Sequence, residues 1–418
     1  MVITGKGSDG NMSNESILEN RKLYQRNKML NVIRSNENVS RNDVKKVTAY
    51  SMTTVLNTID EMIHDGLIYE EQCNDVRVGR RPVWLRLNAE GGYFIGVEFN
   101  RSKIHCVVLD FTGTTVFGCE QKICKEHKKA EEVIGLVKDT IRNAIEFLRG
   151  KEEKIIGIGL GIPGYSDKKR GIAVSYNFFD EWENIEIKKL IEAEFDIPCY
   201  IDNNVNVMIY AYKWLVYRGK CEDMLFVSVR SGARVIPIVN NQPVSSSYGV
   251  SGELGHVKIK GGSRLCSCGR YGCLNSEISD VAIVNKIIDG IRVGRFKEIN
   301  QMINGDENLI TMSVFVESVR QGHEDSLGLL NKIAIFLGDA LGMLANIFAP
   351  RKIVLFGELA ELGDLLLDQL RDLVCREVIE ENSVGLEIVA SGFGRNLGAM
   401  GAAALVMQEA FEFVEELI

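Results

Sequence analysis

Apolar residues in the first 70 positions recur at steps of three and four, a spacing that predicts helices between Ile17 and Ile68. The positions that carry this period are Leu23, Met29, Leu30, Ile33, Val44, Val47, Met52, Val55, Leu56, Ile59, Met62 and Ile63. Polar breaks at 35–41 and 48–51 divide the region into three helices. Ser40 and Ser51 are suited to cap the second and third helices.

The pattern changes after Gly66, which stands where a left-handed residue would end the third helix. Residues 67–72 and 83–88 are typical of two strands, and a polar loop separates them. Three helices followed by a two-stranded wing predict a winged helix-turn-helix over 17–88. Residues 1–16 are polar and rich in Gly, Ser and Asn, so we expect a disordered lead-in.

From residue 91 onward, two similar series of strands and helices follow. The first series has strands at 93–100, 103–111, 115–123, 154–164 and 199–204, with helices at 130–149 and 187–198. The second has strands at 224–230, 233–244, 351–358 and 386–391, with helices near 281–294 and 326–348 and a mostly helical connection at 295–325. Near-continuous apolar strands interleaved with helices predict an α/β fold. We expect one effector region, 91–418, in two lobes (about 91–205 and 206–418), with the C-terminal helix a candidate to return to the first lobe and a ligand cleft between lobes.

Composition and charge fit a cytoplasmic protein. Of 418 residues, 45% are hydrophobic and 25% charged, no apolar run approaches the roughly 20 residues of a membrane span, and the N-terminus lacks a secretory apolar segment. The net charge of −8 is uneven, because residues 1–88 hold 13 basic against 11 acidic residues. A slightly basic end on an acidic body permits DNA binding without proving it.

The third predicted helix carries short polar residues suited to base edges and phosphates. They are Ser51, Thr53, Thr54 and Asn57. In the wing loop, Arg80 and Arg81 lie between a Gly and a Pro, a position from which arginines can enter a narrow minor groove. The alternative is a helical adaptor packed on the larger region, and the arginine pair favours DNA.

One histidine and three cysteines fall within 18 residues: His256, Cys266, Cys268 and Cys273. Cysteines of a cytosolic protein are mostly reduced, and this set suits a closed tetrahedral zinc site. Gly269 and Gly272 would let the loop turn so that the thiolates converge. The alternative, three exposed thiols without a metal, explains the clustering less well.

A polar cluster, Asp202 to Asn206, ends a predicted strand, where amides and a carboxylate suit the hydroxyls of a sugar. The alternative is that Asn203 or Asn204 caps a helix starting at Val205. Phosphate-binding loops are degraded. No G-x-x-x-x-G-K-[ST] segment occurs, the first hairpin (98–102) has no glycine, and the comparable turn (230–234) has one.

Four spaced segments resemble the ROK family of repressors, uncharacterised frames and sugar kinases. They are GLGIPG at 159–164, ELGH at 253–256, CSCGRYGC at 266–273 and SGFGRNLGAMGAAAL at 391–405. The resemblance covers nearly the whole chain from about residue 18. The Gly-Arg-Arg-Pro wing is similar to the N-terminal domain of the family's repressors, such as those of xylose and N-acetylglucosamine. The resemblance implies an actin-like, ribonuclease-H-like two-lobed sugar-kinase fold.

The resemblance also implies ligands. The residues that match the family's structural zinc ligands are His256, Cys266, Cys268 and Cys273. Asn203, Glu253 and His256 match contacts to sugar hydroxyls, and Gly164 belongs to the turn that lines the same pocket. His256 would serve metal and sugar with different ring nitrogens.

Two positions depart from the family pattern. The catalytic aspartate falls on Asn204, and an amide is not a base near neutral pH. A sugar-contacting glutamate falls on Asn275, and the nearby Glu277 would point elsewhere on a helix. Both asparagines can still hydrogen-bond a sugar, so we keep them in the expected site. With base and phosphate loops missing, we expect no enzyme activity.

These observations predict a repressor that binds a pseudo-palindromic operator as a homodimer or dimer of dimers and senses a sugar or sugar derivative. A ligand can act this way only if it binds two conformations with different affinity. Three alternatives stay open: a sugar kinase with a fused DNA-binding domain, a protein-interaction adaptor, and a repressor whose pocket has decayed.

Overall fold

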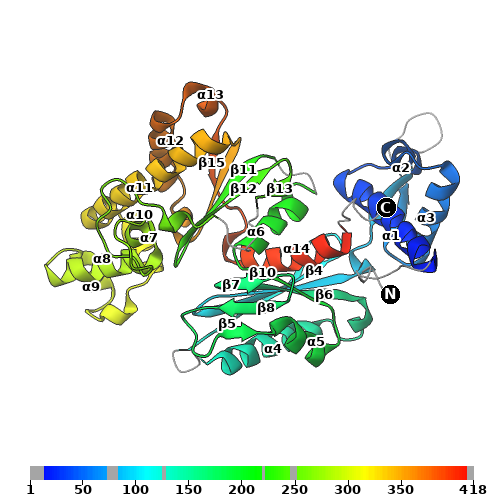
Figure 1. The fold of residues 1–418 in the computed structure, drawn as a ribbon, viewed down its shortest axis with the longest axis horizontal. Coiled ribbons are helices and arrows are strands. Elements are labelled where there is room, and N and C mark those ends of the chain that lie inside the picture. The colour runs from blue at the N-terminus through cyan, green and yellow to red at the C-terminus, as the bar shows by residue number, and fades with distance from the viewer. Residues whose placement is uncertain (1–13, 73–82, 125–128, 219–221, 245–251, 412–418) are drawn as a thin grey trace. The chain divides into compact units, whose positions relative to one another are not determined.

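A computed structural model of the chain describes residues 14–72, 83–124, 129–218, 222–244 and 252–411 (Figure 1). Internal contacts divide the protein into a first unit, residues 1–220 with 396–418, and a second unit, residues 221–395.

The three helices expected at the N-terminus are present: α1 (Asn14–Ser35), α2 (Arg41–Thr48) and α3 (Met52–His64). Ser40 caps α2 in a reciprocal capping box, since its side chain accepts from the Asp43 N–H and the Asp43 carboxylate accepts from the Ser40 N–H. Ser51 caps α3 by accepting from the Thr54 N–H. Gly66 adopts φ +72°, as expected for a residue that ends a helix.

Two antiparallel strands follow, β1 (Ile68–Gln72) and β2 (Val83–Leu87), with Ile68 opposite Leu87. One buried residue from each strand, Ile68 and Leu85, joins the core that α1 and α3 build around Met29 and Ile59. The predicted pair of strands is therefore present, and it packs on the helices.

The first unit contains a five-stranded sheet of order β10-β6-β3-β4-β5. Its strands are β3 (Tyr93–Phe99), β4 (Lys103–Asp110), β5 (Thr115–Lys122), β6 (Ile155–Ile162) and β10 (Cys199–Asn203). The first three form an antiparallel meander, and β6 and β10 run parallel to β3. Helices α4 (Ala130–Phe147) and α5 (Ile187–Phe195) cover one face, and α14 (Leu397–Phe411) lies across the other (Figure 1).

Glycines in the strands let α14 approach the sheet closely. A Cβ atom at Gly159 of β6 would lie 1.8 Å from the Ala402 carbonyl oxygen, and one at Gly96 of β3 would lie 2.1 Å from that of Ala399. A side chain at either position would push the helix away, so these glycines serve helix–sheet packing. The C-terminal helix thus belongs to the first unit.

No element was predicted for residues 165–186, where the structure has a small antiparallel sheet. Its strands are β7 (Tyr165–Asp167), β8 (Ile172–Ser175) and β9 (Glu183–Ile185). Strands this short carry too few residues for a two-residue period to be visible. Helix α6 (Asn206–Ala211) and a π-helical turn (Tyr212–Val216) follow β10.

The second unit repeats the plan of the first with a sheet of order β13-β12-β11-β14-β15. Its strands are β11 (Met224–Val229), β12 (Ala233–Val239), β13 (Gln242–Pro243), β14 (Lys352–Phe356) and β15 (Glu387–Ala390). Again the first three strands are antiparallel and the last two run parallel to the first. The repeated topology agrees with the two similar lobes of the expected actin-like fold.

The helices of the second unit are α7 (Asn275–Ile278), α8 (Asp280–Arg292), α9 (Lys297–Met302), α10 (Met312–Arg320), α11 (Glu324–Phe348), α12 (Asp364–Glu377) and α13 (Glu380–Ser383). Single 3₁₀ turns lie at Ala89–Gly91, Glu152–Lys154, Leu254–His256, Glu307–Leu309, Glu358–Leu362 and Gly394–Asn396. Helix α11 is long and apolar enough to span a membrane, but Leu330, Ile333 and Leu341 of this helix are fully buried in the core of the unit. A core helix of a globular unit explains the same composition.

Candidate functional sites

The cysteine-rich loop of the second unit brings its four expected ligands together. The Nδ1 or Nε2 atom of His256 and the Sγ atoms of Cys266, Cys268 and Cys273 all lie within 4.8 Å of one another. Cys268 Sγ is 3.7 Å from Cys273 Sγ, and Cys266 Sγ is 3.7 Å from His256 Nδ1. A tetrahedral ion at about 2.3 Å from each sulfur separates two sulfurs by roughly 3.7 Å. The donor set and its spacing therefore fit zinc.

The local backbone structure orients these four side chains toward one another. Gly269 and Gly272 adopt φ +81° and +79°, as the sequence suggested, and the Gly269 N–H donates to the Cys266 carbonyl to close a turn. An antiparallel bridge joins Lys258 to Cys273, which fixes the histidine segment beside the last cysteine. Arg270 lowers the pKa of the exposed Cys268 thiol to about 6, which favours the thiolate that binds metal.

In the first unit, Asn203 holds a turn together. Its Nδ2 donates to the Gly164 carbonyl at 2.6 Å, and its Oδ1 accepts from the Val205 N–H at 2.9 Å. Gly164 has φ +76°, and a Cβ there would lie 2.2 Å from the Ser175 carbonyl oxygen. The predicted helix-cap role is found in part. Asn203 accepts from the Val205 N–H, just before α6 begins at Asn206, whereas the Asn204 side chain donates elsewhere.

Asn204 has a different partner. Its Nδ2 donates to Oε1 of Glu98, a residue of β3 that is only 2% exposed, at 3.2 Å. The sequence analysis missed Glu98, because the two residues are 106 positions apart. Asp202 accepts from the Asn203 N–H and from Asn206. These polar groups lie at the carboxyl ends of β6 and β10, the position expected for a ligand site.

The remaining predicted sugar residues lie in the second unit. Glu253 forms an ion pair with Arg234 at 3.4 Å. Asn275 accepts from the Ala233 N–H at 2.7 Å, and its side chain occupies the space where Gly255 would carry a Cβ. Glu277 is buried and pairs with Lys286 at 2.5 Å. Of the six residues predicted to bind the sugar, the first unit contains Gly164, Asn203 and Asn204. The second unit contains Glu253, His256 and Asn275.

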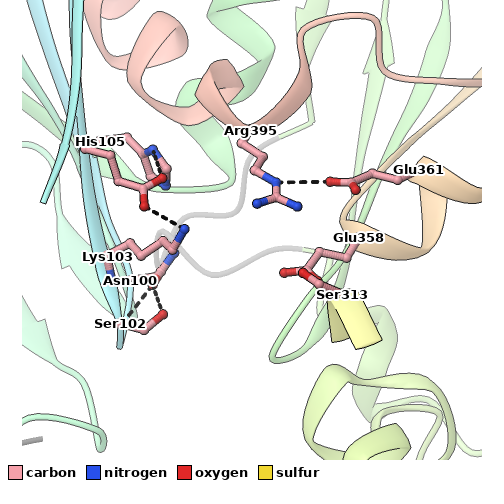
Figure 2. Close-up of polar contacts among 9 residues, drawn as sticks. Asn100, Ser102, Lys103, His105, Ser313, Glu358, Glu361 and Arg395 are labelled. Carbon is pink, nitrogen blue, oxygen red and sulfur yellow. Dashed lines mark hydrogen bonds and ion pairs between the residues drawn. The ribbon is translucent and has the colours of Figure 1, made fainter. Parts of the chain in front are cut away.

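At the turn of the first hairpin, the backbone N–H groups of Asn100, Ser102 and Lys103 already have acceptors. Figure 2 shows Asn100, whose Oδ1 accepts from the N–H groups of Ser102 and Lys103 and from the Ser102 hydroxyl. A phosphate cradle needs such N–H groups unpaired. The same figure shows an ion pair of the second unit, between Arg395 and Glu361.

The N-terminal half of α3 exposes Ser51, Thr53 and Asn57, while Thr54 is half-buried and its hydroxyl lies 2.8 Å from that of Ser51. The C-terminal half carries Asp60, Glu61 and Asp65, which would repel phosphates. Exposed basic residues come from α2, at Lys45 and Lys46. The predicted wing arginines, Arg80 and Arg81, lie outside the described residues.

Comparison with known proteins shows the family to which the chain belongs. The model of the ROK family matches residues 94–409, so the chain belongs to the ROK family. A protein called xylose repressor, from Caldicellulosiruptor bescii, is 28% identical over 396 residues, covering 94% of this chain and 98% of that protein. A glucokinase from Halalkalibacterium halodurans is 25% identical and covers 76% of this chain and 96% of its own. A solved ROK family transcriptional regulator, a homologue of the E. coli MLC protein, shares the fold with a TM-score of 0.79 at 19% identity, covering 94% of this chain and 97% of its own.

Proposed function

We propose that this protein is a transcriptional repressor that binds operator DNA through residues 17–88 and responds to a sugar or sugar derivative. The observation that carries the proposal is the block of three helices and two strands that precedes the family match at residue 94. The relative called xylose repressor matches 94% of this chain, whereas the glucokinase covers 76%. Regulation of carbohydrate uptake or metabolism, with xylose as the first effector to test, follows from that relative.

The winged helix-turn-helix reading assigns α3 as the recognition helix. Thr53 and Asn57 are exposed on its N-terminal half, where the positive end of the helix dipole favours approach to DNA. Lys45 and Lys46 of α2 would contact phosphates, and Arg80 and Arg81 would enter the minor groove. The acidic C-terminal half of α3 would point away from the backbone.

The effector region binds its sugar through the six residues already named and carries out no phosphoryl transfer. Asn204 cannot take a proton from a hydroxyl, and its amide donates to Glu98. In the first hairpin, the Lys103 N–H donates to the Asn100 side chain and is not available to a phosphate. In the comparable turn of the second unit, the Ala233 N–H donates to the Asn275 side chain. Zinc held by His256 and the three cysteines would be structural, because four protein ligands leave no open position for substrate.

We further propose a cytoplasmic homodimer or dimer of dimers, because two-fold operators are read by two-fold proteins. Sugar binding would change the spacing of the DNA-binding segments, provided the sugar prefers one conformation.

DNA binding is tested by titrating a labelled fragment from upstream of the protein's own gene and a scrambled fragment of equal length. Thr53→Ala and Asn57→Ala should each weaken binding to the first by about 1–3 kcal/mol and leave the second unchanged. Asn143→Ala, at an exposed asparagine of α4, is the matched control. Equal affinity of the native protein for both fragments would favour the adaptor.

The wing is tested separately. Arg80→Ala with Arg81→Ala should weaken binding most on fragments with A·T-rich flanks. An equal loss of affinity on every fragment would show that the two arginines contact only phosphates.

A coupled assay with ATP and common hexoses and pentoses should detect no phosphorylation. Turnover by the native protein would replace our proposal with the kinase alternative. A thermal-shift screen of the same sugars should give at least one saturable stabilisation, and its absence would favour a decayed pocket.

A further inference from the structure

Two cysteines face each other across the β4–β5 hairpin of the first sheet. Cys106 of β4 lies directly opposite Cys119 of β5 in the antiparallel register. Directly opposite residues project from the same face of a sheet, with Cα atoms about 4.5–5.5 Å apart. A disulfide needs Cα atoms roughly 4.4–6.8 Å apart. The backbone of the hairpin therefore holds these two residues at the Cα spacing of a disulfide.

The two thiols differ in their access to solvent. Both belong to the face of the sheet that α4 covers, where Cys106 is packed into the core beside Val133 and Val137. Cys119 is only partly buried, because β5 is the last strand of its sheet (Figure 1). A small oxidant in solution can therefore reach the Cys119 thiol, whereas the protein shields that of Cys106.

The two thiols also differ in acidity. The interaction with the Cys106 thiol lowers the pKa of Cys119 to about 7. The same interaction, together with burial, raises the pKa of Cys106. Because the thiolate is the form that reacts with oxidants, Cys119 carries the reactive group near neutral pH, and Cys106 keeps its proton. An accessible thiolate beside a second thiol is the arrangement typical of redox-sensing cysteines.

The edge strand has room to adjust around this pair. The register of β4 and β5 shifts between Val108 and Leu109, and such an irregularity interrupts the ladder of hydrogen bonds locally. Gly118 precedes Cys119, and a glycine inside a strand weakens it. The small change in twist that brings two facing sulfur atoms to bonding distance is therefore confined to one hairpin.

We propose that Cys106 and Cys119 form a reversible disulfide in the presence of hydrogen peroxide, with Cys119 as the site of attack and Cys106 as the resolving thiol. The Cys119 thiolate attacks one peroxide oxygen, so that an S–O bond forms, the O–O bond breaks, and the released hydroxide takes a proton to become water. The Cys106 sulfur then attacks the Cys119 sulfur. An S–S bond replaces the S–O bond, and the departing hydroxide leaves with the Cys106 proton as a second water.

The reaction is balanced, because two thiols lose two electrons and two protons and one peroxide is reduced to two waters. A dithiol reductant reverses it by thiol–disulfide exchange, with Cys119 as the accessible sulfur. The disulfide also protects Cys119, since a sulfenic acid that finds no thiol is oxidised further to the irreversible sulfinic acid.

The test uses a single tryptic peptide, because cleavage after Lys103 and Lys122 releases residues 104–122, which contain Cys106 and Cys119 and no other cysteine. The full chain is treated with hydrogen peroxide at neutral pH, alkylated without reduction, digested and analysed by mass spectrometry. The peptide should become lighter by two hydrogen atoms and take up no alkyl group, and dithiothreitol should restore two alkylatable thiols. Cys375, an exposed cysteine of α12, should be oxidised more slowly by about tenfold or more.

Three variants assign the roles of the two cysteines. Cys119→Ser should leave Cys106 alkylatable after peroxide treatment. Cys106→Ala should stop the reaction at the sulfenic acid of Cys119, which dimedone captures. Cys124→Ser, at an exposed cysteine just beyond β5, is the matched control and should behave as the native protein does. If Cys106→Ala fails to fold, the native peptide and Cys119→Ser decide the question.

Three results would overturn the proposal. They are two alkylated thiols in peptide 104–122 when Cys375 is already oxidised, a disulfide that joins this peptide to another, and sulfinic acid at Cys119 with Cys106 still alkylatable. The inference is independent of the proposed repressor function. Disulfide formation in a protein that binds no DNA would refute the repressor function alone, and DNA binding by a protein whose peptide stays reduced would refute this inference alone.

Discussion

The cysteine-rich loop of the second unit and the asparagine turn of the first were both predicted as ligand sites, and the structure treats them differently. At the loop, four donor atoms converge within 4.8 Å. At the turn, Asn203 and Asn204 have protein partners, the Gly164 carbonyl and the Glu98 carboxylate. A thiolate and an imidazole have few uses in a polar loop other than metal binding, whereas an amide can satisfy itself within the protein.

Under the proposed function, the difference indicates which parts of a kinase fold persist once phosphoryl transfer is no longer needed. Zinc held by the loop would stiffen the second unit whether or not a reaction occurs. The hydrogen bond from Asn203 to the Gly164 carbonyl supports the backbone path after β6. Under the same proposal, Asn204 places an amide where the catalytic base of a kinase is expected. The following substitutions test this contrast.

The largest effect is expected at the turn. Gly164→Ala combines a φ of +76° with a Cβ placed 2.2 Å from a carbonyl oxygen, and should cost about 3 kcal/mol. Gly269→Ala in the cysteine loop has φ +81° but open space around it, and should cost about 1 kcal/mol. Thermal unfolding midpoints of the two variants compare them directly. Equal losses would show that the turn around Asn203 is not rigid.

Metal loss comes next. Cys268→Ser should release zinc and lower the unfolding midpoint by about 5 °C, on the order of 2 kcal/mol, because metal binding stabilises the folded loop. Elemental analysis gives zinc per chain, and Cys375→Ser, at an exposed cysteine of α12, is the control. Zinc retained at one per chain in Cys268→Ser would remove this residue from the ligand set.

The smallest effect is expected where the family's aspartate is restored. Asn204→Asp replaces an N–H donor, 3.2 Å from Glu98, with a second carboxylate, and should cost about 1 kcal/mol near neutral pH. The pair would hold a proton in the folded state that the unfolded chain releases, so the loss should be larger at pH 8 than at pH 5. Unfolding midpoints at both values, against the native protein, measure it.

The same variant sharpens the functional contrast. It should gain no phosphoryl transfer, because the N–H groups of Ser102 and Lys103 in the first hairpin still donate to Asn100. ATP-dependent phosphorylation of any sugar by Asn204→Asp would show that the phosphate loops are competent and that a single residue silenced the enzyme.

Local features of this protein could be predicted from its sequence. The caps at Ser40 and Ser51 and the left-handed Gly66 depend on residues within a few positions of one another, as do the turns at Gly269 and Gly272. The strands of both sheets follow from apolar runs. The ligand set at 256–273 follows from spacing, because metal binding needs only four donors on one short, flexible loop.

Other features were decided only by the tertiary structure. Helix α14 is apolar on nearly every side, so its sequence pattern does not predict which face packs on a sheet. The close approach of Gly159 to Ala402 is what allows the helix to pack on the first sheet. The contact of Asn204 with Glu98 and the aromatic surroundings of Arg34 join residues more than 70 positions apart. Such pairs form when the chain closes on itself, and neither residue's local sequence contains the identity of its partner. The sequence by itself determined most of the elements and the cluster of four donors at 256–273. The packing of distant segments determined which polar groups were left for a ligand.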